Sequence, residues 1–210
     1  MQQIMLEALK QTVYMVFLAT ILSVIGLIPA VILTLTAPDG LRPHKIIYEI
    51  LSFIVNVFRS FPFIILLVIL IPFTRLLVGK AIGTTASIVP LTVSAIPFIA
   101  RVFESALRET NPGVIEAARS FGASDFQIIV RVYFKESVPR LINGIVLLII
   151  SLIGYSAMAG TVGGGGIGDI AIRYGYQQYN TEYLIVCSVI LIIFVQLIQM
   201  IGNGLYKKLS

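Results

Sequence analysis

The sequence predicts an all-α membrane protein that crosses the bilayer with five helices. Hydrophobic residues make up 58 % of its 210 residues and charged residues only 12 %, against about 45–50 % and about 25 % in soluble domains. The charges leave four uninterrupted gaps of 28, 20, 28 and 24 residues. Each gap reaches the roughly 20 residues that carry a helix across about 30 Å of hydrocarbon. The gaps are continuously apolar rather than alternating, which excludes a β-barrel.

The five predicted spans follow one another along a single transmembrane domain, residues 1–210. The first occupies the gap between Lys10 and Asp39 and is too long for the apolar region of a signal peptide. The second is interrupted only by Glu49 and Arg59, and the other three are bounded by charges at both ends. The predicted spans are about 12–37, 46–73, 83–107, 140–160 and 183–206.

Arg59 lies near the middle of the second span, where a charge is costly. Such a residue is expected to face the bundle interior at a functional position. Pro62 follows three residues later and frees backbone groups of the helix. Two alternatives therefore stay open: Arg59 satisfies the freed carbonyls, or it pairs with Glu49 or Glu104. Arg101 and Glu104, three residues apart, are expected to form a local ion pair.

Lysine and arginine counts predict the orientation of the chain. Five spans put the termini on opposite sides, and with the C-terminus inside, nine of these residues face the cytoplasm and four face outward. Cytoplasmic loops carry the excess of positive charge, which favours an outer N-terminus and a cytoplasmic C-terminus. The net charge of +5 is then explained by topology, and no nucleic-acid partner is expected.

The longest polar stretch, residues 109–139, is predicted to be cytoplasmic and structured. Asn111 followed by Pro112 is typical of a helix start. Gly122 can take the left-handed conformation that ends a helix. This part of the loop is therefore expected to form a short helix and a sharp turn.

A second helix is expected directly after that turn. Ser124 and Gln127 have the spacing of a capping box, and Pro139 fits the first turn of the fourth span. The pair of helices is expected to lie at the membrane surface. Apolar side chains available to pack there are Phe126, Ile129, Val130, Tyr133 and Phe134.

Residues 116–118 and Gly122 resemble the EAA loop of bacterial ABC-importer permeases, in which Glu-Ala-Ala is followed after three residues by Gly. The chain departs from that pattern at Val138, where leucine is usual, and at Lys135, where proline often stands. Further similar segments extend the resemblance over nearly the whole chain to the permeases of the D/L-methionine importer family. These segments are 56–67, 71–75, 88–93, 96–101, 154–160, 163–166 and 173–176.

The resemblance implies that the first short helix of the loop is a coupling helix, which sits in a cleft of an ATP-hydrolysing subunit. Ala117 and Ala118 would allow close approach, Glu116 could pair with a basic group, and Gly122 would permit the sharp turn. In the alternative interpretation, Glu116 only favours the N-terminus of a helix.

The resemblance also implies the partners and the transported substrate. They would be a second permease copy in a homodimer, two ABC ATPase subunits on the cytoplasmic face, and a lipid-anchored or periplasmic substrate-binding protein outside. ATP and magnesium would bind the ATPase, with no cofactor on this chain. The implied function is import of D- or L-methionine across the bacterial cytoplasmic (inner) membrane by alternating access. Another amino acid or small solute remains open, because specificity in such importers lies largely with the separate receptor.

Residues 154–168 are rich in small residues and contain four consecutive glycines. No Gly-Lys-Ser/Thr follows, so this is not a phosphate-binding loop. We expect Tyr155, Ser156, Ala157 and Met158, together with Arg59 of the second span, to line the translocation pathway or its outer gate. Close helix packing by small residues is the alternative.

An intramembrane enzyme is a distant alternative. His44 is the only histidine and Cys187 the only cysteine, so an internal disulfide is excluded and histidine-rich metal sites are not expected. No Ser–His or Ser–Lys arrangement is evident. The sequence therefore predicts neither catalytic nor metal-binding residues.

Overall fold

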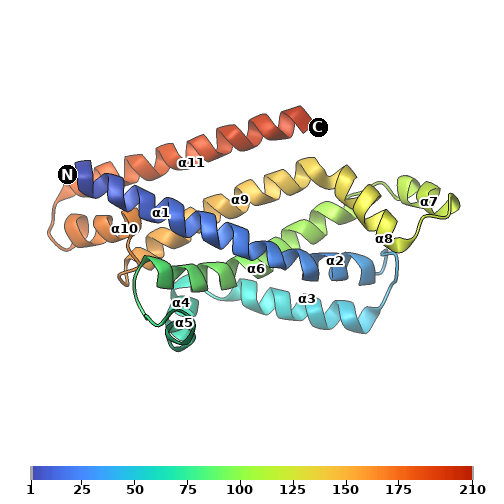
Figure 1. Cartoon of the computed structure of the whole chain (residues 1–210), viewed down its shortest axis with the longest axis horizontal. Helices are drawn as coiled ribbons and strands as arrows, with labels where there is room; N and C mark the ends of the chain where they lie inside the picture. The colour runs from blue at the N-terminus through green and yellow to red at the C-terminus, as the bar shows by residue number, and fades with distance from the viewer. Residues whose placement is uncertain (1, 210) are drawn as a thin grey trace.

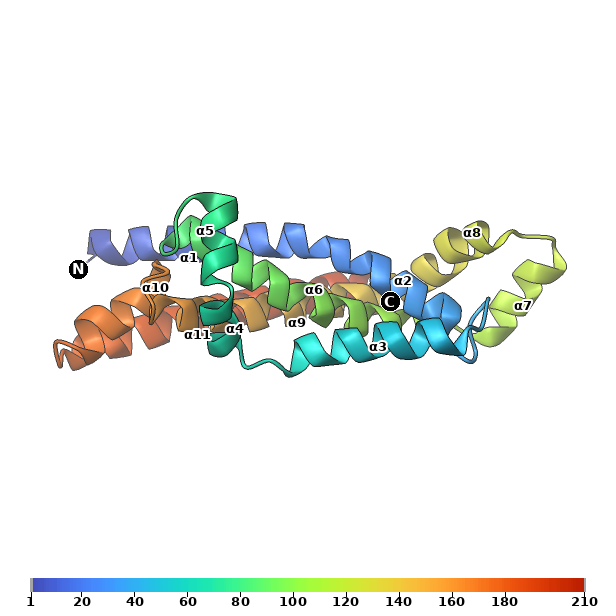
Figure 2. The same cartoon turned by 90° about the horizontal axis from the view of Figure 1, so that it is seen from below.

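The computed structural model describes residues 2–209, and within this range the chain is helical and has no strands. Figure 1 shows an elongated bundle of long helices that run roughly along one axis. The N-terminus lies at one end, and α7 (Pro112–Ser120) and α8 (Asp125–Ile128) lie at the other. The quarter-turned view in Figure 2 shows the same separation.

The first span is one long helix made of three consecutive pieces. α1 (Gln2–Ser23), a 3₁₀ turn (Val24–Gly26) and α2 (Leu27–Thr36) run together over 35 residues. The helix starts earlier than the predicted 12–37, and its first turns carry the solvated charges of Glu7 and Lys10, whose charged groups lie 3.9 Å apart. A Cβ on Gly26 would lie 2.5 Å from the Ile96 carbonyl oxygen. Glycine therefore lets this helix pack directly on the third span.

The second predicted span, 46–73, is not one straight helix. α3 (Lys45–Ser60) ends at an extended Phe61 and Pro62, and α4 (Phe63–Ile69) leaves at 98° to it. Pro62 has no N–H to continue the helical ladder, and the extended backbone at Phe61 and Pro62 separates the two helices. α5 (Ile71–Val78) follows and ends at Gly79, whose φ is +75°.

The third span, α6 (Thr84–Arg108), is the centre of the bundle and close to the predicted 83–107. It packs against α1, α2, α3 and the fourth span. Pro90 and Pro97 lie inside it. Large, fully buried apolar side chains of α6 are Leu91, Ile99 and Leu107, and Met15, Leu148 and Leu152 of neighbouring helices are also fully buried.

The fourth span begins much earlier than the predicted 140–160. α8, a π-helical turn (Ile129–Tyr133) and α9 (Phe134–Gly160) form one continuous helix from Asp125. Pro139 therefore lies inside a helix and not in its first turn, and that expectation was wrong. The helix starts at the capping box and continues without interruption to Gly160. The second half of the 109–139 loop is thus an extension of a membrane helix.

The last elements complete the end of the bundle that holds the N-terminus. α10 (Gly166–Ile170) and a π-helical turn (Ala171–Tyr176) lead to α11 (Thr181–Leu209), which includes the predicted span 183–206. α11 packs on α9 from outside (Figure 1). A Cβ on Gly202 would lie 2.3 Å from a Val146 methyl, so this contact also depends on glycine.

Four helices of the described chain are long and apolar enough to cross a membrane, and the bent pair α3–α4 raises the number to five. The predicted all-α membrane class is confirmed. The difference is that the second crossing is bent sharply at Pro62.

Candidate coupling surface and translocation face

The predicted coupling helix, α7, projects from the end of the bundle (Figures 1 and 2). Its start is capped as predicted: the Asn111 side chain accepts a hydrogen bond from the Gly113 N–H at 2.9 Å, and Pro112 occupies the first turn. None of its nine residues is fully buried within this chain. Most of the surface of this short, capped helix is therefore accessible.

The turn after α7 also follows the predicted local structure. Gly122 has φ +77°, a conformation that is costly for other residues. Ser124 Oγ accepts from the Gln127 N–H at 3.3 Å, and Gln127 Oε1 accepts from the Ser124 N–H at 2.9 Å. Both halves of the capping box are formed, so the direction of the chain on leaving α7 is well defined.

One side of α7 rests on the bundle and the other faces outward. Ala118 is half-buried in a cluster that contains Leu41, Leu107 and Tyr133. Glu116 and Ala117 are exposed. Of the four predicted coupling residues, Ala118 therefore seats the helix, and Glu116, Ala117 and Gly122 lie on its accessible side.

Two aromatic residues beside the turn are strongly exposed and were not among the predicted coupling residues: Phe121 is 90 % exposed and Phe126 is 74 % exposed. Their position on either side of Gly122, in an otherwise polar segment, is the signal that could have identified them. Large exposed aromatic groups are typical anchors of protein interfaces.

A stripe of α9 is left uncovered by this chain. Leu147 is 55 % exposed and Met158 47 % exposed, and Asn143 and Gly154 are exposed as well. Spacings of four, seven and four residues put them on one face of the helix. This stripe is a candidate translocation face or contact with a second copy.

The four predicted pathway residues of α9, residues 155–158, do not all lie on that exposed face. Met158 lies on it, whereas Ser156 is buried and donates to the Ile153 carbonyl at 2.7 Å. Ala157 is half-buried against α10, where a Cβ on Gly168 would lie 2.3 Å from the Ala157 oxygen.

Tyr155 connects the fourth span to the bent second span. Its ring is half-buried and stacks on Phe63 with centroids 4.7 Å apart and planes 7° apart. Phe63 is the first residue of α4. The break at Pro62 therefore places α4 directly against the predicted pathway segment.

The glycine segment is tightly folded and contacts α1. Gly165 and Gly166 have φ of +76° and +80°. The Gly166 N–H donates to Gln11 Oε1 at 2.8 Å, and the Ile167 N–H donates to Thr12 Oγ1 at 3.0 Å. α1 thus caps the start of α10 in place of local side chains.

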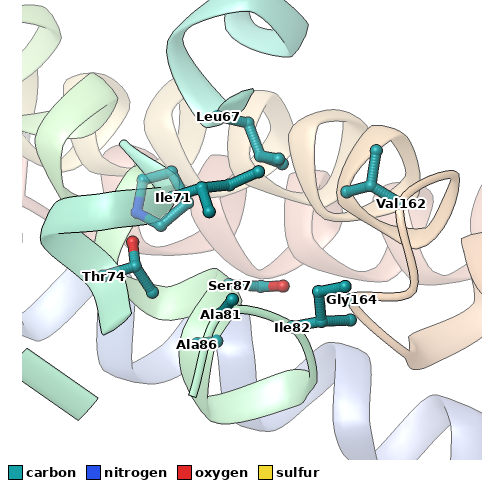
Figure 3. Close-up of a pocket in the computed structure, with 10 residues that line it drawn as sticks. Leu67, Ile71, Thr74, Ala81, Ile82, Ala86, Ser87, Val162 and Gly164 are labelled. Carbon is teal, nitrogen blue, oxygen red and sulfur yellow. The ribbon is translucent and has the colours of Figure 1, made fainter. Parts of the chain in front are cut away.

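A small pocket lies where this segment meets α4, α5 and α6 (Figure 3). Thr74 and Ser87 contribute hydroxyl groups to its lining, and no charged residue lines it. Ser87 Oγ is already bonded to the Gly83 carbonyl at 3.1 Å. The pocket offers no group that would recognise a charged cargo.

Arg59 does not face the interior of its own bundle. It is exposed at the C-terminal end of α3. Among the described residues, Glu49 pairs with Lys45 at 3.9 Å and Glu104 pairs with Arg101 at 2.7 Å. The predicted Arg101–Glu104 pair is confirmed, whereas neither carboxylate pairs with Arg59.

The single histidine has a structural role, since His44 Nδ1 accepts from the Ile47 N–H at 3.3 Å and caps α3. Within residues 2–209, no group of three or more His, Cys, Asp and Glu side chains is placed to hold a metal ion.

Several known proteins are similar to this chain. The chain is 47 % identical over 208 residues to the probable D-methionine transport system permease protein MetI of Vibrio cholerae, covering 99 % of this chain and 92 % of that protein. It is 44 % identical over 172 residues to the methionine import system permease protein MetP of Bacillus subtilis, covering 82 % and 78 %.

Solved structures give the same result. A chain of the MetNI methionine ABC transporter in an inward-facing conformation matches with a TM-score of 0.98 and 44 % identity, over 100 % of this chain and 98 % of that one. A chain of an amino acid ABC transporter solved with histidines matches in fold alone, with a TM-score of 0.81 and 20 % identity over 99 % and 94 %.

The profile of one protein family matches residues 23–210, which is most of the sequence. The chain belongs to the family of binding-protein-dependent transport system inner membrane components.

Proposed function

We propose that this chain is the permease subunit of an ATP-driven importer that moves methionine across the bacterial cytoplasmic membrane. The observation that carries the proposal is the capped, outward-facing α7 at one end of an apolar five-span bundle. The similarity to methionine permeases over nearly the full length supports methionine as the cargo. The chain is a transport subunit, and ATP hydrolysis takes place on a separate partner.

The ATPase subunit docks on α7 and on the turn that follows it. Glu116 provides a carboxylate for a basic group, Ala117 allows close approach, and Phe121 provides an apolar anchor. ATP and magnesium bind to that subunit. Since the N-terminus lies at the opposite end of the bundle (Figure 1), this docking places the N-terminus outside, where a lipid-anchored or periplasmic substrate-binding protein delivers the cargo.

Two copies of the chain form the pathway between them. The uncovered stripe of α9 faces the second copy, with Met158 at its outer part, and Tyr155 lies beside it against Phe63 of α4. An apolar thioether side chain such as that of methionine suits a face of Leu147 and Met158, because thioethers are polarisable and adaptable. Ser156 and Ala157 support this face from behind.

Alternating access follows from this arrangement. Closure of two ATPase subunits brings the two α7 helices together and rotates the helices joined to them, so that the pathway opens to one side at a time. Arg59, exposed at the break between α3 and α4, is directed to the pathway or to the second copy.

Reconstituted uptake tests the proposal. The permease, its cognate ATPase and its receptor are placed in vesicles with ATP on the ATPase side, and uptake of labelled methionine is measured against competing unlabelled amino acids. We expect ATP-dependent methionine uptake that D- or L-methionine competes out. Absence of ATP-dependent methionine uptake, with uptake of a different labelled amino acid by the same vesicles, overturns the cargo and favours the alternative substrate.

Two charge reversals test the docking surface. Glu116→Lys, on the exposed side of α7, is expected to abolish co-purification of the ATPase and ATP-driven uptake. Glu49→Lys is the matched control, because Glu49 is also exposed, with 62 % of its side chain accessible, but lies on α3. Retention of the ATPase by Glu116→Lys contradicts the assigned surface.

A further inference from the structure

Glu104 is the centre of a buried polar cluster between α3 and α6. Its side chain is only 2 % exposed. One carboxylate oxygen accepts from Arg101 Nη1 at 2.7 Å, and the other accepts from the Tyr48 hydroxyl at 3.1 Å and lies 3.6 Å from Arg108 Nη1. Both oxygens of this buried carboxylate are therefore engaged, by two arginines and a tyrosine hydroxyl, so its orientation is well defined.

Arg101 connects this centre to α3. Its second terminal nitrogen donates to Ser52 Oγ at 2.6 Å and to Asn56 Oδ1 at 2.9 Å. Tyr48, Ser52 and Asn56 are four residues apart along α3 and therefore share one face. Val55 is the one fully buried residue of α3 and packs with Leu33 and Ala100. The polar face adds specific hydrogen bonds to α6.

Arg108 connects the same centre to the loop of residues 37–44. Its Nη2 donates to Asp39 Oδ1 at 2.7 Å. That loop is in turn held at two points to the predicted coupling segment, which comprises α7, the following turn and α8. Arg119 of α7 donates to the Leu41 carbonyl at 2.9 Å, and Arg42 pairs with Asp125 at the start of α8.

The far end of α3 reaches the predicted pathway. α3 ends four residues after Asn56, and the chain turns at Pro62 into α4, whose Phe63 stacks on Tyr155. α3 therefore has the coupling segment attached near its first turn and the Tyr155 segment near its last.

We infer that Glu104 is a positioning residue that ties α3 to the coupling segment, and that α3 is a second mechanical connection between the docked ATPase and the Tyr155 segment. α6 and α9 are joined to the coupling loop by the chain itself. α3 is instead preceded by loop 37–44, which Arg119 and Arg42 hold to the coupling segment. Glu104 and Arg108 hold the polar face of α3 and this loop to α6. The inference rests on the proposed function and adds a route to it.

The coupling ratio, ATP hydrolysed per methionine imported by the reconstituted complex, tests this connection. Glu104→Gln keeps the size of the side chain but removes the charge that holds both arginines. We expect methionine uptake to fall at least about tenfold while the rate of ATP hydrolysis stays within about twofold of the wild-type rate. A tenfold fall corresponds to the loss of one favourable interaction. Glu109→Gln is the matched control on the same stretch of chain, because Glu109 is 59 % exposed, and its ratio is expected to stay unchanged.

A purely structural role predicts a different result. Loss of stability lowers the amount of assembled complex, and uptake and hydrolysis then fall together with an unchanged ratio. An unchanged ratio in an assembled Glu104→Gln complex therefore overturns the inference. Absence of methionine uptake by the wild-type complex in the same vesicles instead refutes the proposed function.

A surface pair keeps the test decisive if Glu104→Gln does not assemble. Arg42→Asp breaks the exposed pair with Asp125, and Asp125→Arg in the same chain restores it with reversed charges. A raised ratio in the single variant that returns toward wild type in the double variant supports the connection. A normal ratio in Arg42→Asp overturns it.

Discussion

Replacing Gly160 with alanine puts a methyl group into a contact that has no room for it. A Cβ at this position would lie 2.2 Å from the Asp169 nitrogen and 2.5 Å from the Gly168 carbonyl carbon. Both neighbours are backbone atoms, so α9 and α10 must separate by about 1 Å to reach ordinary contact, which forfeits up to about half of the dispersion energy across the gap.

The expected cost of Gly160→Ala is about 2 kcal/mol. Overpacking costs about 1–3 kcal/mol, and alanine returns about 0.5–1 kcal/mol of helix propensity; the rigidity of the two backbones places the result toward the upper end. At about 2–4 °C per kcal/mol for a chain of this size, the unfolding midpoint should fall by about 4–8 °C.

Gly154→Ala in the same helix is the matched control. No atom lies within 4 Å of a Cβ at Gly154, so the chain gains helix propensity without a clash. The assay is the heat-induced loss of the monodisperse peak of the detergent-solubilised protein on size exclusion. Equal midpoints for Gly160→Ala and wild type, or an equal fall for Gly154→Ala, would refute the packing argument.

Three further changes probe single contacts. Thr12→Val removes the acceptor of the buried Ile167 N–H, which should cost about 1–3 kcal/mol and speed hydrogen exchange at the start of α10; unchanged exchange would show that this bond does not hold the glycine segment. Gly122→Ala meets no atom within 4 Å and suffers only the left-handed penalty of about 1–2 kcal/mol, so ATPase binding in a pull-down should weaken without being lost. Complete loss of the ATPase would mean that the turn does more than redirect the chain. Phe63→Leu and Tyr155→Leu, measured singly and together in thermal unfolding, should show a coupling energy of about 0.5–1.5 kcal/mol, and strict additivity would exclude a stabilising stack.

Local sequence patterns predicted the structure of α7 and of the turn after it most reliably. Asn111, Gly122 and the Ser124–Gln127 pair act on backbone groups within four residues of themselves, so their spacing alone predicts the caps and the turn that the structure contains. The extent of the following helix was misjudged. Pro139 resembles a helix start, yet the chain is already helical from Asp125.

The prolines show a limit of what the local sequence predicts about helix breaks. Pro90 and Pro97 lie inside α6, whereas the chain at Pro62 turns by 98°. Each of them lacks the same N–H, so the residue type cannot distinguish the outcomes. The surroundings differ: α6 is enclosed by neighbouring helices, and α4 is held in its new direction by the Phe63–Tyr155 stack.

The sequence by itself determined that lipid is part of the solvent, that the spans are helical and where α7 is capped. Those properties follow from composition and from neighbours a few residues away. Only the tertiary structure decided that, of the predicted pathway residues of α9, Met158 stays uncovered, and where Arg59 lies. It also decided that Arg101 contacts Ser52, 49 residues earlier in the chain. The surroundings of these side chains are set by distant segments whose approach is governed by packing around α6, and no local pattern records that packing.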